Sequence, residues 1–415
     1  MTVLQQQGAA AKAATYALAT ASTAVKNAAL EAMAQALIQG QTDWLATNAQ
    51  DVAAAREAGM RPAMLDRLTL TPERIAGIVD GVRQVAALPD PIGRVDRMET
   101  RPNGLIIGRR RVPLGVIAII FEARPNVTVD AAALCLKSGN VCILRGGKEA
   151  IRSNRCAVEL MRGALVQAGL PADCISLVQD TSHETAGELM HLDGYVDVLI
   201  PRGGAGLIRA VAKEASVPVI RTGEGVCHVY VDDEADLDMA ASILYNAKCS
   251  RPSVCNAAEC VLVHRDAAAE FWKRALPLLS AKSVELRGDA ESLPLLGAGA
   301  VPAAESDWDA EYDDYILAVK TVGGLEEAVE FINRHGTGHS EAIVTTNYFK
   351  AQRFLDAVDA AAVYVNASTR FTDGGEFGLG AEIGISTQKM HARGPMGLEE
   401  LTSCKYIIYG QGQVR

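Results

Sequence analysis

The sequence lacks any apolar run that approaches the ~20 residues a helix needs to cross a bilayer. The longest obvious run is Leu114–Phe121. The N-terminus also lacks the charged start and apolar block of a secretory signal. No Arg occurs before Arg56, whereas a transit peptide would be Arg-rich. These absences predict a cytoplasmic protein that does not enter a membrane.

Signs of a disulfide framework or a metal site are also missing. The nine cysteines are odd in number and include no C-x-x-C pair, and most lie in apolar runs such as Ala133–Leu136. This is typical of reduced, buried thiols. His335 and His339 stand four apart, but the segment between them resembles a turn, and no Glu or Cys has the spacing of zinc ligands. We expect no metal.

Positive charge is scarce as well. The formal net charge of −10 argues against a broad nucleic-acid surface, but it leaves room for one small basic pocket that binds an anion. The run Arg109–Arg111 could form a nucleic-acid patch by motif alone. In an acidic chain, an edge that faces solvent or another subunit is the favoured interpretation.

The 415 residues are enough for two or three domains. Residues up to about 95 are rich in helix formers, with helical spacing of apolar residues over Ala13–Ile38 and a helix start at Thr71-Pro72. Two extended runs, Met98–Arg101 and Leu105–Val112, then flank an Asn-Gly turn. This pattern predicts a β-hairpin.

Apolar strands then alternate with amphipathic helices, which indicates parallel sheets covered on both faces. The first set of predicted strands comprises Val116–Phe121, Val141–Leu144, Ile175–Val178, Val196–Ile200 and Val217–Ile220. A second α/β segment begins near Val229, and a short strand is expected at Tyr406–Tyr409. The loop-rich tail from Ser368 has the length of a functional loop.

Two of the predicted strands run into glycines, at Arg145-Gly146-Gly147-Lys148 and at Pro201–Gly206. Bare glycines let backbone N–H groups approach phosphate oxygens, and a following helix adds partial positive charge. Neither segment is a G-x-G-x-x-G fingerprint or a P-loop, and each alone could be a tight turn. Two such loops on successive units, each with an Arg, favour a dinucleotide.

Cys255 differs from the other cysteines because it follows a turn containing Pro252 and has Lys, Arg and Ser around it. Nearby cations lower a thiol pKa and favour the reactive thiolate. Asn126 follows the strand Val116–Phe121, where its amide could donate to a developing oxyanion. From the residues alone, the favoured interpretation of Cys255 is an unreactive core or loop thiol, and that of Asn126 is part of a simple turn.

Taken together, these segments resemble the aldehyde dehydrogenase superfamily, and within it the γ-glutamyl phosphate reductases of proline biosynthesis. The resemblance covers essentially the whole chain. Its most specific stretches are Phe121–Asn126 with Leu136–Asn140, Pro201–Leu207, Cys227–Val231, Arg251–Asn256, Val363–Gly380 and Ser386–Gly397.

The resemblance implies an α/β fold with two doubly wound parallel-sheet domains and a small β arm for oligomerisation. Residues 1–97 and 113–227 would form an NADPH-binding, Rossmann-like domain, residues 228–395 the catalytic domain, and residues 98–112 and 396–415 the arm. At least a dimer is then expected. Association with a glutamate kinase is left open.

It also implies roles for single residues. Cys255 matches the thiol that becomes a thioester, and Asn126 matches the amide that holds the oxyanion together with the Cys255 backbone N–H. Two cations beside the adenosine ribose suit a 2′-phosphate and so favour NADPH. The positions that match cofactor contacts are Arg145, Gly146, Gly147, Lys148, Pro201, Arg202, Gly203, Gly204 and Glu311. The candidates for holding L-glutamyl 5-phosphate are Arg124, Arg251, Ser253 and Arg370, because Arg suits bidentate anion recognition.

One departure from the family pattern sharpens the expected chemistry. Hydrolytic aldehyde dehydrogenases carry a water-activating Glu about 34 residues before the nucleophile, whereas that position here is Arg221, and Glu224 is out of register. We therefore expect phosphate, not water, to exchange with the thiol. The competing hypotheses are a hydrolytic aldehyde dehydrogenase and a non-enzymatic nucleotide- or RNA-binding protein.

Overall fold

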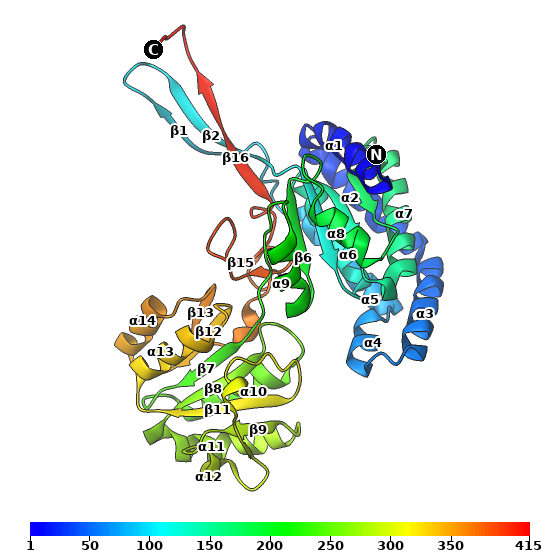
Figure 1. Cartoon of the computed structure of the whole chain (residues 1–415). Coiled ribbons are helices and arrows are strands. Elements are labelled where there is room, and N and C mark those ends of the chain that lie inside the picture. Colours follow the sequence, from blue (N-terminus) through cyan, green and yellow to red (C-terminus); the bar gives the residue numbers. More distant parts are fainter. The chain divides into compact units, whose positions relative to one another are not determined.

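Two parallel sheets organise the chain, one in each of two units (Figure 1). The structure is a computed structural model that describes residues 1–62, 64–204 and 206–415 in full and positions 63 and 205 by their backbone only. The first unit comprises residues 1–222, 378–384 and 396–415. The second comprises residues 223–377 and 385–395.

The sheet of the first unit is parallel and has four strands. Their spatial order is β5 (Ile175–Leu177), β4 (Val141–Arg145), β3 (Val116–Phe121) and β6 (Val198–Arg202). Every residue of β3 is buried, which is why this strand is a continuous apolar run. The sequence prediction of these strands is confirmed.

The predicted strand Val217–Ile220 was wrong. Only a single bridge joins Val219 to Leu199, and it lies outside the named strands. The Leu199 N–H donates to the Pro218 carbonyl at 2.8 Å. The Ile220 N–H donates back to the Leu199 carbonyl at 3.0 Å, which completes this one bridge. Pro218 has no N–H and so offers no donor for a further step of the ladder.

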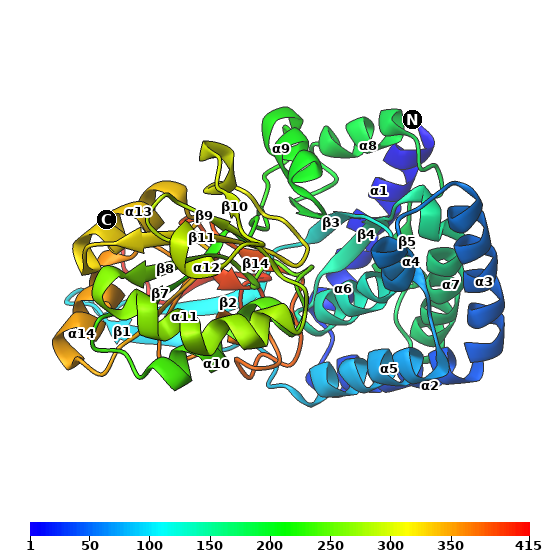
Figure 2. The same cartoon turned by 90° about the horizontal axis from the view of Figure 1, so that it is seen from below.

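Helices surround this sheet, and Figure 2 shows α3 alongside α7 and α5 alongside α2. Their bounds are α1 (Val3–Ala19), α2 (Thr23–Gln39), α3 (Gln41–Glu57), α4 (Pro62–Leu68), α5 (Pro72–Ala87), α6 (Pro125–Lys137), α7 (Ile151–Gln167), α8 (His183–Met190) and α9 (Ala205–Glu214). The helix expected over Ala13–Ile38 is two helices. The Ser22 hydroxyl accepts the Val25 N–H and starts the second one. The predicted start at Thr71-Pro72 is confirmed.

A three-stranded antiparallel sheet belongs to the first unit and carries the C-terminus (Figure 1). It pairs β1 (Val95–Thr100) with β2 (Ile106–Pro113), as the Asn-Gly turn predicted. The third strand, β16 (Thr402–Tyr409), pairs with β2 along its full length and is longer than expected. Apolar side chains of this sheet are exposed, namely Met98, Ile106, Tyr406, Ile408 and Tyr409.

The sheet of the second unit is parallel and has seven strands. Their spatial order is β10 (Val301–Pro302), β9 (Glu285–Gly288), β11 (Ile316–Val322), β8 (Ala258–His264), β7 (Cys227–Val231), β12 (Ser340–Val344) and β13 (Ala362–Val365). The sequence analysis did not include β9 and β10, which are short and partly exposed.

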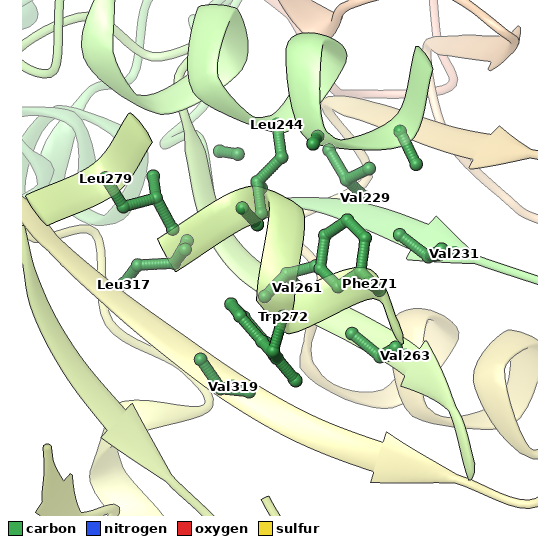
Figure 3. Close-up of a cluster of buried hydrophobic side chains, with 14 of the residues drawn as sticks. Val229, Val231, Leu244, Val261, Val263, Phe271, Trp272, Leu279, Leu317 and Val319 are labelled. Atoms are coloured by element: carbon green, nitrogen blue, oxygen red, sulfur yellow. The ribbon is translucent and has the colours of Figure 1, made fainter. Parts of the chain in front are cut away.

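Apolar clusters cover both faces of this sheet. On one face, Val229 of β7 packs with Leu244 of α10 (Leu237–Cys249) and Phe271 of α11 (Arg265–Ser280), as Figure 3 shows. On the other face, Tyr230 of β7 packs with Phe354 of α14 (Tyr348–Ala357), beside α13 (Leu325–His335). Neighbouring residues of one strand thus face opposite clusters, as the pleat requires.

The remaining elements are short. They are α12 (Leu293–Leu296), η1 (Lys148–Ala150), η2 (Ala172–Cys174), η3 (Glu305–Asp307), η4 (Thr369–Phe371) and the antiparallel pair β14 (Ile385–Ser386) and β15 (Gly394–Pro395). Among the described residues, no helix combines the length and apolar character that crossing a bilayer would take.

Candidate active site

Cys255 lies in the connection between α10, which ends at Cys249, and β8, which begins at Ala258. We call residues 250–257 the nucleophile loop. The Cys255 side chain is half-buried, unlike the fully buried Cys227 and Cys260. Burial raises the pKa of the Cys227 thiol well above its usual range, so that thiol stays protonated.

The backbone of Cys255 packs against the start of β7. A Cβ placed on Gly225 would overlap the Cys255 carbonyl oxygen, so only glycine permits this approach. The Cys227 thiol donates to the same carbonyl at 3.2 Å. Cys255, the candidate nucleophile, is therefore held through its main chain.

Glu311 lies beside this contact. Its carboxylate accepts the backbone N–H of Gly225 at 3.0 Å. Burial is the main cause that raises its pKa, and the charges of Asp313 and Glu224 add to the effect. Glu311, the residue predicted to bind the nicotinamide ribose, thus contacts Gly225, and Gly225 in turn contacts the Cys255 backbone.

A buried ion pair brackets the nucleophile loop. Lys248, in the last turn of α10, donates to Glu259, the second residue of β8, at 2.6 Å, and both side chains are inaccessible to solvent. Burial raises the pKa of Glu259 to about 8. The Lys248 ammonium also lies 5.8 Å from the Tyr312 ring centroid. The two ends of the loop are therefore joined in the core of the unit.

These residues gather at the amino ends of the parallel strands. Gly225 precedes β7, Cys255 precedes β8, Glu311 precedes β11 and His339 precedes β12. Parallel sheets usually bind ligands at the carboxyl ends of their strands. The edge of the second unit that carries Cys255 therefore departs from that preference.

The candidate cofactor residues of the first unit follow the usual preference. Arg145 ends β4, the segment Gly146–Lys148 follows it, and Gly203 and Gly204 lie between β6 and α9. A Cβ on Gly203 would stand 2.8 Å from the Glu122 side chain that follows β3. The loops after three neighbouring strands therefore converge at the carboxyl edge of this sheet.

This edge offers hydrogen-bond donors that the protein does not use. Arg145 donates from one Nη to the Thr181 and Ser182 carbonyls at 2.7 and 3.1 Å. Its Nε and the amide nitrogen of Asn154 are buried and have no acceptor among the described residues. Burial lowers the pKa of Arg145. Unused donors beside bare glycines fit the phosphates and ribose of a dinucleotide.

Asn126 occupies the first turn of α6, directly after the carboxyl end of β3. Its amide donates to Asp130 Oδ2 at 3.1 Å. Desolvation raises the pKa of Asp130 to about 6, and the bond from Asn126 partly opposes this rise. The segment is thus helical from Pro125, and the amide of Asn126 is held along the helix axis.

The four candidates for substrate binding fall in both units. Arg124 precedes α6 in the first unit, and the exposed Arg251 and half-buried Ser253 lie on the nucleophile loop. Arg370, in η4, also reaches this loop. Desolvation, followed by the charge of Arg251, lowers the pKa of Arg370, which shows that the two cations are near one another.

The sequence analysis gave no role to Gly225, Lys248, Asn256 or Glu259. Lys248 and Asn256 stand within the run around Cys255, and that proximity was the available signal. Their partners could not be read from it. At the position expected for a water-activating Glu, Arg221 is exposed in the first unit, whereas Glu224 belongs to the second.

Comparison with known proteins gives a consistent result. The model of the "Aldehyde dehydrogenase family" matches residues 2–292 and 314–407. The chain is 58% identical to a γ-glutamyl phosphate reductase of Halothermothrix orenii, covering 95% of this chain and 94% of the relative. It is 57% identical to that of Heliobacterium modesticaldum, with 99% of both covered. The crystal structure of the Thermotoga maritima γ-glutamyl phosphate reductase superposes over 100% of both chains with a TM-score of 0.96 and 45% identity.

Proposed function

The chain belongs to the aldehyde dehydrogenase family, and we propose that it reduces L-glutamyl 5-phosphate to L-glutamate 5-semialdehyde and phosphate with NADPH. This is the second step of proline biosynthesis from glutamate. The observation that carries the proposal is the 58% identity, over nearly the full length of both chains, to a protein named for this reaction.

The nucleophile in this proposal is Cys255. Its thiolate attacks the acyl carbon, a C–S bond forms, and the bond from carbon to the phosphate oxygen breaks. Phosphate leaves with the electron pair, so this step needs no strong general acid. Asn126 and the Cys255 backbone N–H are the proposed donors to the oxyanion that develops on the carbonyl. The product of this half-reaction is a thioester on Cys255.

NADPH, when bound, supplies the hydride that reduces the thioester. In the first unit the residues proposed to hold it are Arg145, Gly146, Gly147, Lys148, Pro201, Arg202, Gly203 and Gly204; in the second unit, Glu311. The converging glycine loops and the unused donors of Arg145 and Asn154 support this assignment. The resulting hemithioacetal then releases the aldehyde and returns Cys255 to its thiolate.

Anion recognition falls to Arg124, Arg251, Ser253 and Arg370, which we propose for the phosphate and the α-carboxylate of the substrate. We propose further that the exposed apolar side chains on β2 and β16 join two or more copies of the chain. The protein would work in the cytoplasm, where a glutamate kinase would deliver the unstable acyl phosphate.

The direct test couples the purified chain to a glutamate kinase with glutamate, ATP and NADPH. NADPH consumption is expected only when kinase, ATP and glutamate are all present. The matched control replaces NADPH by NADH, which should be consumed more slowly. No NADPH consumption, in the presence of demonstrated acyl phosphate formation, would refute the proposed function.

A further inference from the structure

The residue that follows Cys255 is tied to a segment more than a hundred positions away in sequence. Asn256 is only 4% exposed. Its amide nitrogen donates to the Arg370 and Thr372 carbonyls at 3.2 and 2.9 Å. The Thr369 hydroxyl donates to the Asn256 carbonyl at 2.7 Å. Both the main chain and the side chain of Asn256 are therefore bound to η4 and the residue after it.

The Arg370 side chain closes this connection. Its guanidinium donates to Asn256 Oδ1 and, through Nε, to the Ser250 hydroxyl at 3.1 Å. Ser250 in turn donates to the Asn246 carbonyl in the last turn of α10 at 2.7 Å. A single Arg therefore spans the nucleophile loop from its first residue to the residue after the nucleophile.

The segment that carries Arg370 is itself anchored to the sheet. The Thr372 hydroxyl lies 2.7 Å from the Tyr364 hydroxyl of β13 and 2.6 Å from the Ser340 hydroxyl of β12. Thr369, Thr372 and Ser340 are buried. Since buried hydrogen-bond networks are rigid when satisfied, the loop is fixed to two strands that do not carry it.

The charge of Arg370 also acts on the nucleophile. Desolvation lowers the pKa of Arg370, and the neighbouring Cys255 opposes this change. The interaction is mutual, since a nearby cation favours the thiolate form of a cysteine.

We propose that Asn256 and Arg370 are positioning residues that fix the nucleophile loop and favour the thiolate of Cys255 before any substrate arrives. This inference rests on the proposed role of Cys255 as the nucleophile. It gives Arg370 a role beyond the proposed substrate contact, because two of its nitrogens bind Ser250 and Asn256 of the nucleophile loop.

The test is alkylation of Cys255 by iodoacetamide without substrate or cofactor, followed by mass spectrometry of the Cys255 peptide over a range of pH. Arg370→Gln should alkylate about tenfold more slowly at neutral pH, with a pH profile shifted upward by about one unit. Asn256→Ala should lower kcat while the KM for NADPH stays the same. The control Arg353→Lys changes a surface ion pair with Glu326 and should leave the profile unchanged.

Two further outcomes separate the possible failures. If Arg370→Gln alkylates at the wild-type rate and pH, and only the KM for the acyl phosphate rises, Arg370 acts on the substrate alone and the inference is wrong. If Arg370→Gln does not fold, the variant Arg370→Lys tests the inference in its place. This variant keeps the charge and should keep the pH profile with a reduced kcat, and a wild-type kcat would overturn the inference. Full turnover by Cys255→Ser would instead refute the proposed function itself.

Discussion

The carboxyl edge of the four-stranded sheet and the amino edge of the seven-stranded sheet present their candidate residues differently. The first edge consists of short loops with bare glycines, and donors of Arg145 and Asn154 remain unused there. At the second edge, the main chain of Cys255 is held by Gly225 and Cys227, and the next residue is bound from a distant segment. The first edge is suited to a ligand with hydrogen-bond acceptors, such as phosphate oxygens. The second edge is suited to a residue whose position must be fixed, as we propose for Cys255.

The largest effect should come from Cys255→Ser, which removes the reactive thiolate from the second edge and leaves the first intact. Turnover should fall by about 10⁴-fold or more, as for other lost nucleophiles. NADPH affinity, measured by the cofactor's fluorescence, should stay at the wild-type value. A loss of NADPH affinity as large as the loss of turnover would show that Cys255 is needed for cofactor binding at the first edge.

The second largest effect, on stability, should come from breaking the buried ion pair between Lys248 and Glu259. Lys248→Met removes the cation that lowers the pKa of the buried Glu259, so this carboxyl takes up a proton and stays in the core without its partner. The orphaned group should cost about 1–3 kcal/mol in the free energy of unfolding. The double variant Lys248→Met with Glu259→Leu should recover much of this loss. Urea denaturation measures both, and equal losses in the single and double variants would contradict the account.

The first edge has its own partly buried carboxyl group, Asp130, which gives the stability of the fold a dependence on pH. Its pKa in the folded state is about 6, above the ordinary 3.8, so the folded chain binds this proton more tightly. The stability it contributes is full below pH 3.8 and declines by about 2–3 kcal/mol as the pH rises through about 6.

Asp130→Asn should remove this decline from the plot of unfolding free energy against pH. The exposed Asp80→Asn on α5 is the control and should leave the plot unchanged. An Asp130→Asn plot parallel to that of the wild type would show that Asp130 does not titrate in this range.

The smallest effect is expected from the exposed Lys148, which lies in the segment after β4 at the first edge. Lys148→Ala should raise the KM for NADPH by about tenfold, the value of one charge-assisted contact to a phosphate. The KM for NADH should change little. Lys213→Ala, an exposed lysine on α9, is the control. An equal rise for both cofactors would show that Lys148 does not recognise the 2′-phosphate.

The sequence predicted the first edge better than the second, and the reason is physical. Gly146, Gly147, Gly203 and Gly204 are adjacent to their strands, so local pattern and glycine chemistry suffice to place them. The hairpin was predicted for the same reason.

Asn256 was missed because its partners, Thr369 and Arg370, come together with it only in the tertiary fold. Lys248 and Glu259 are each ordinary in sequence, and only burial makes their pairing significant. The false strand at Val217–Ile220 had the right apolar pattern, but Pro218 lacks the N–H that a ladder needs.

We propose that Cys255 exchanges its acyl group with phosphate and not with water. The most direct test of this proposal is the reverse reaction, in which the chain oxidises L-glutamate 5-semialdehyde with NADP⁺ in the presence or absence of phosphate. We expect NADPH to form rapidly only when phosphate, or arsenate in its place, is present. Equal rates without either anion would show that water releases the acyl group, and would identify a hydrolytic aldehyde dehydrogenase instead.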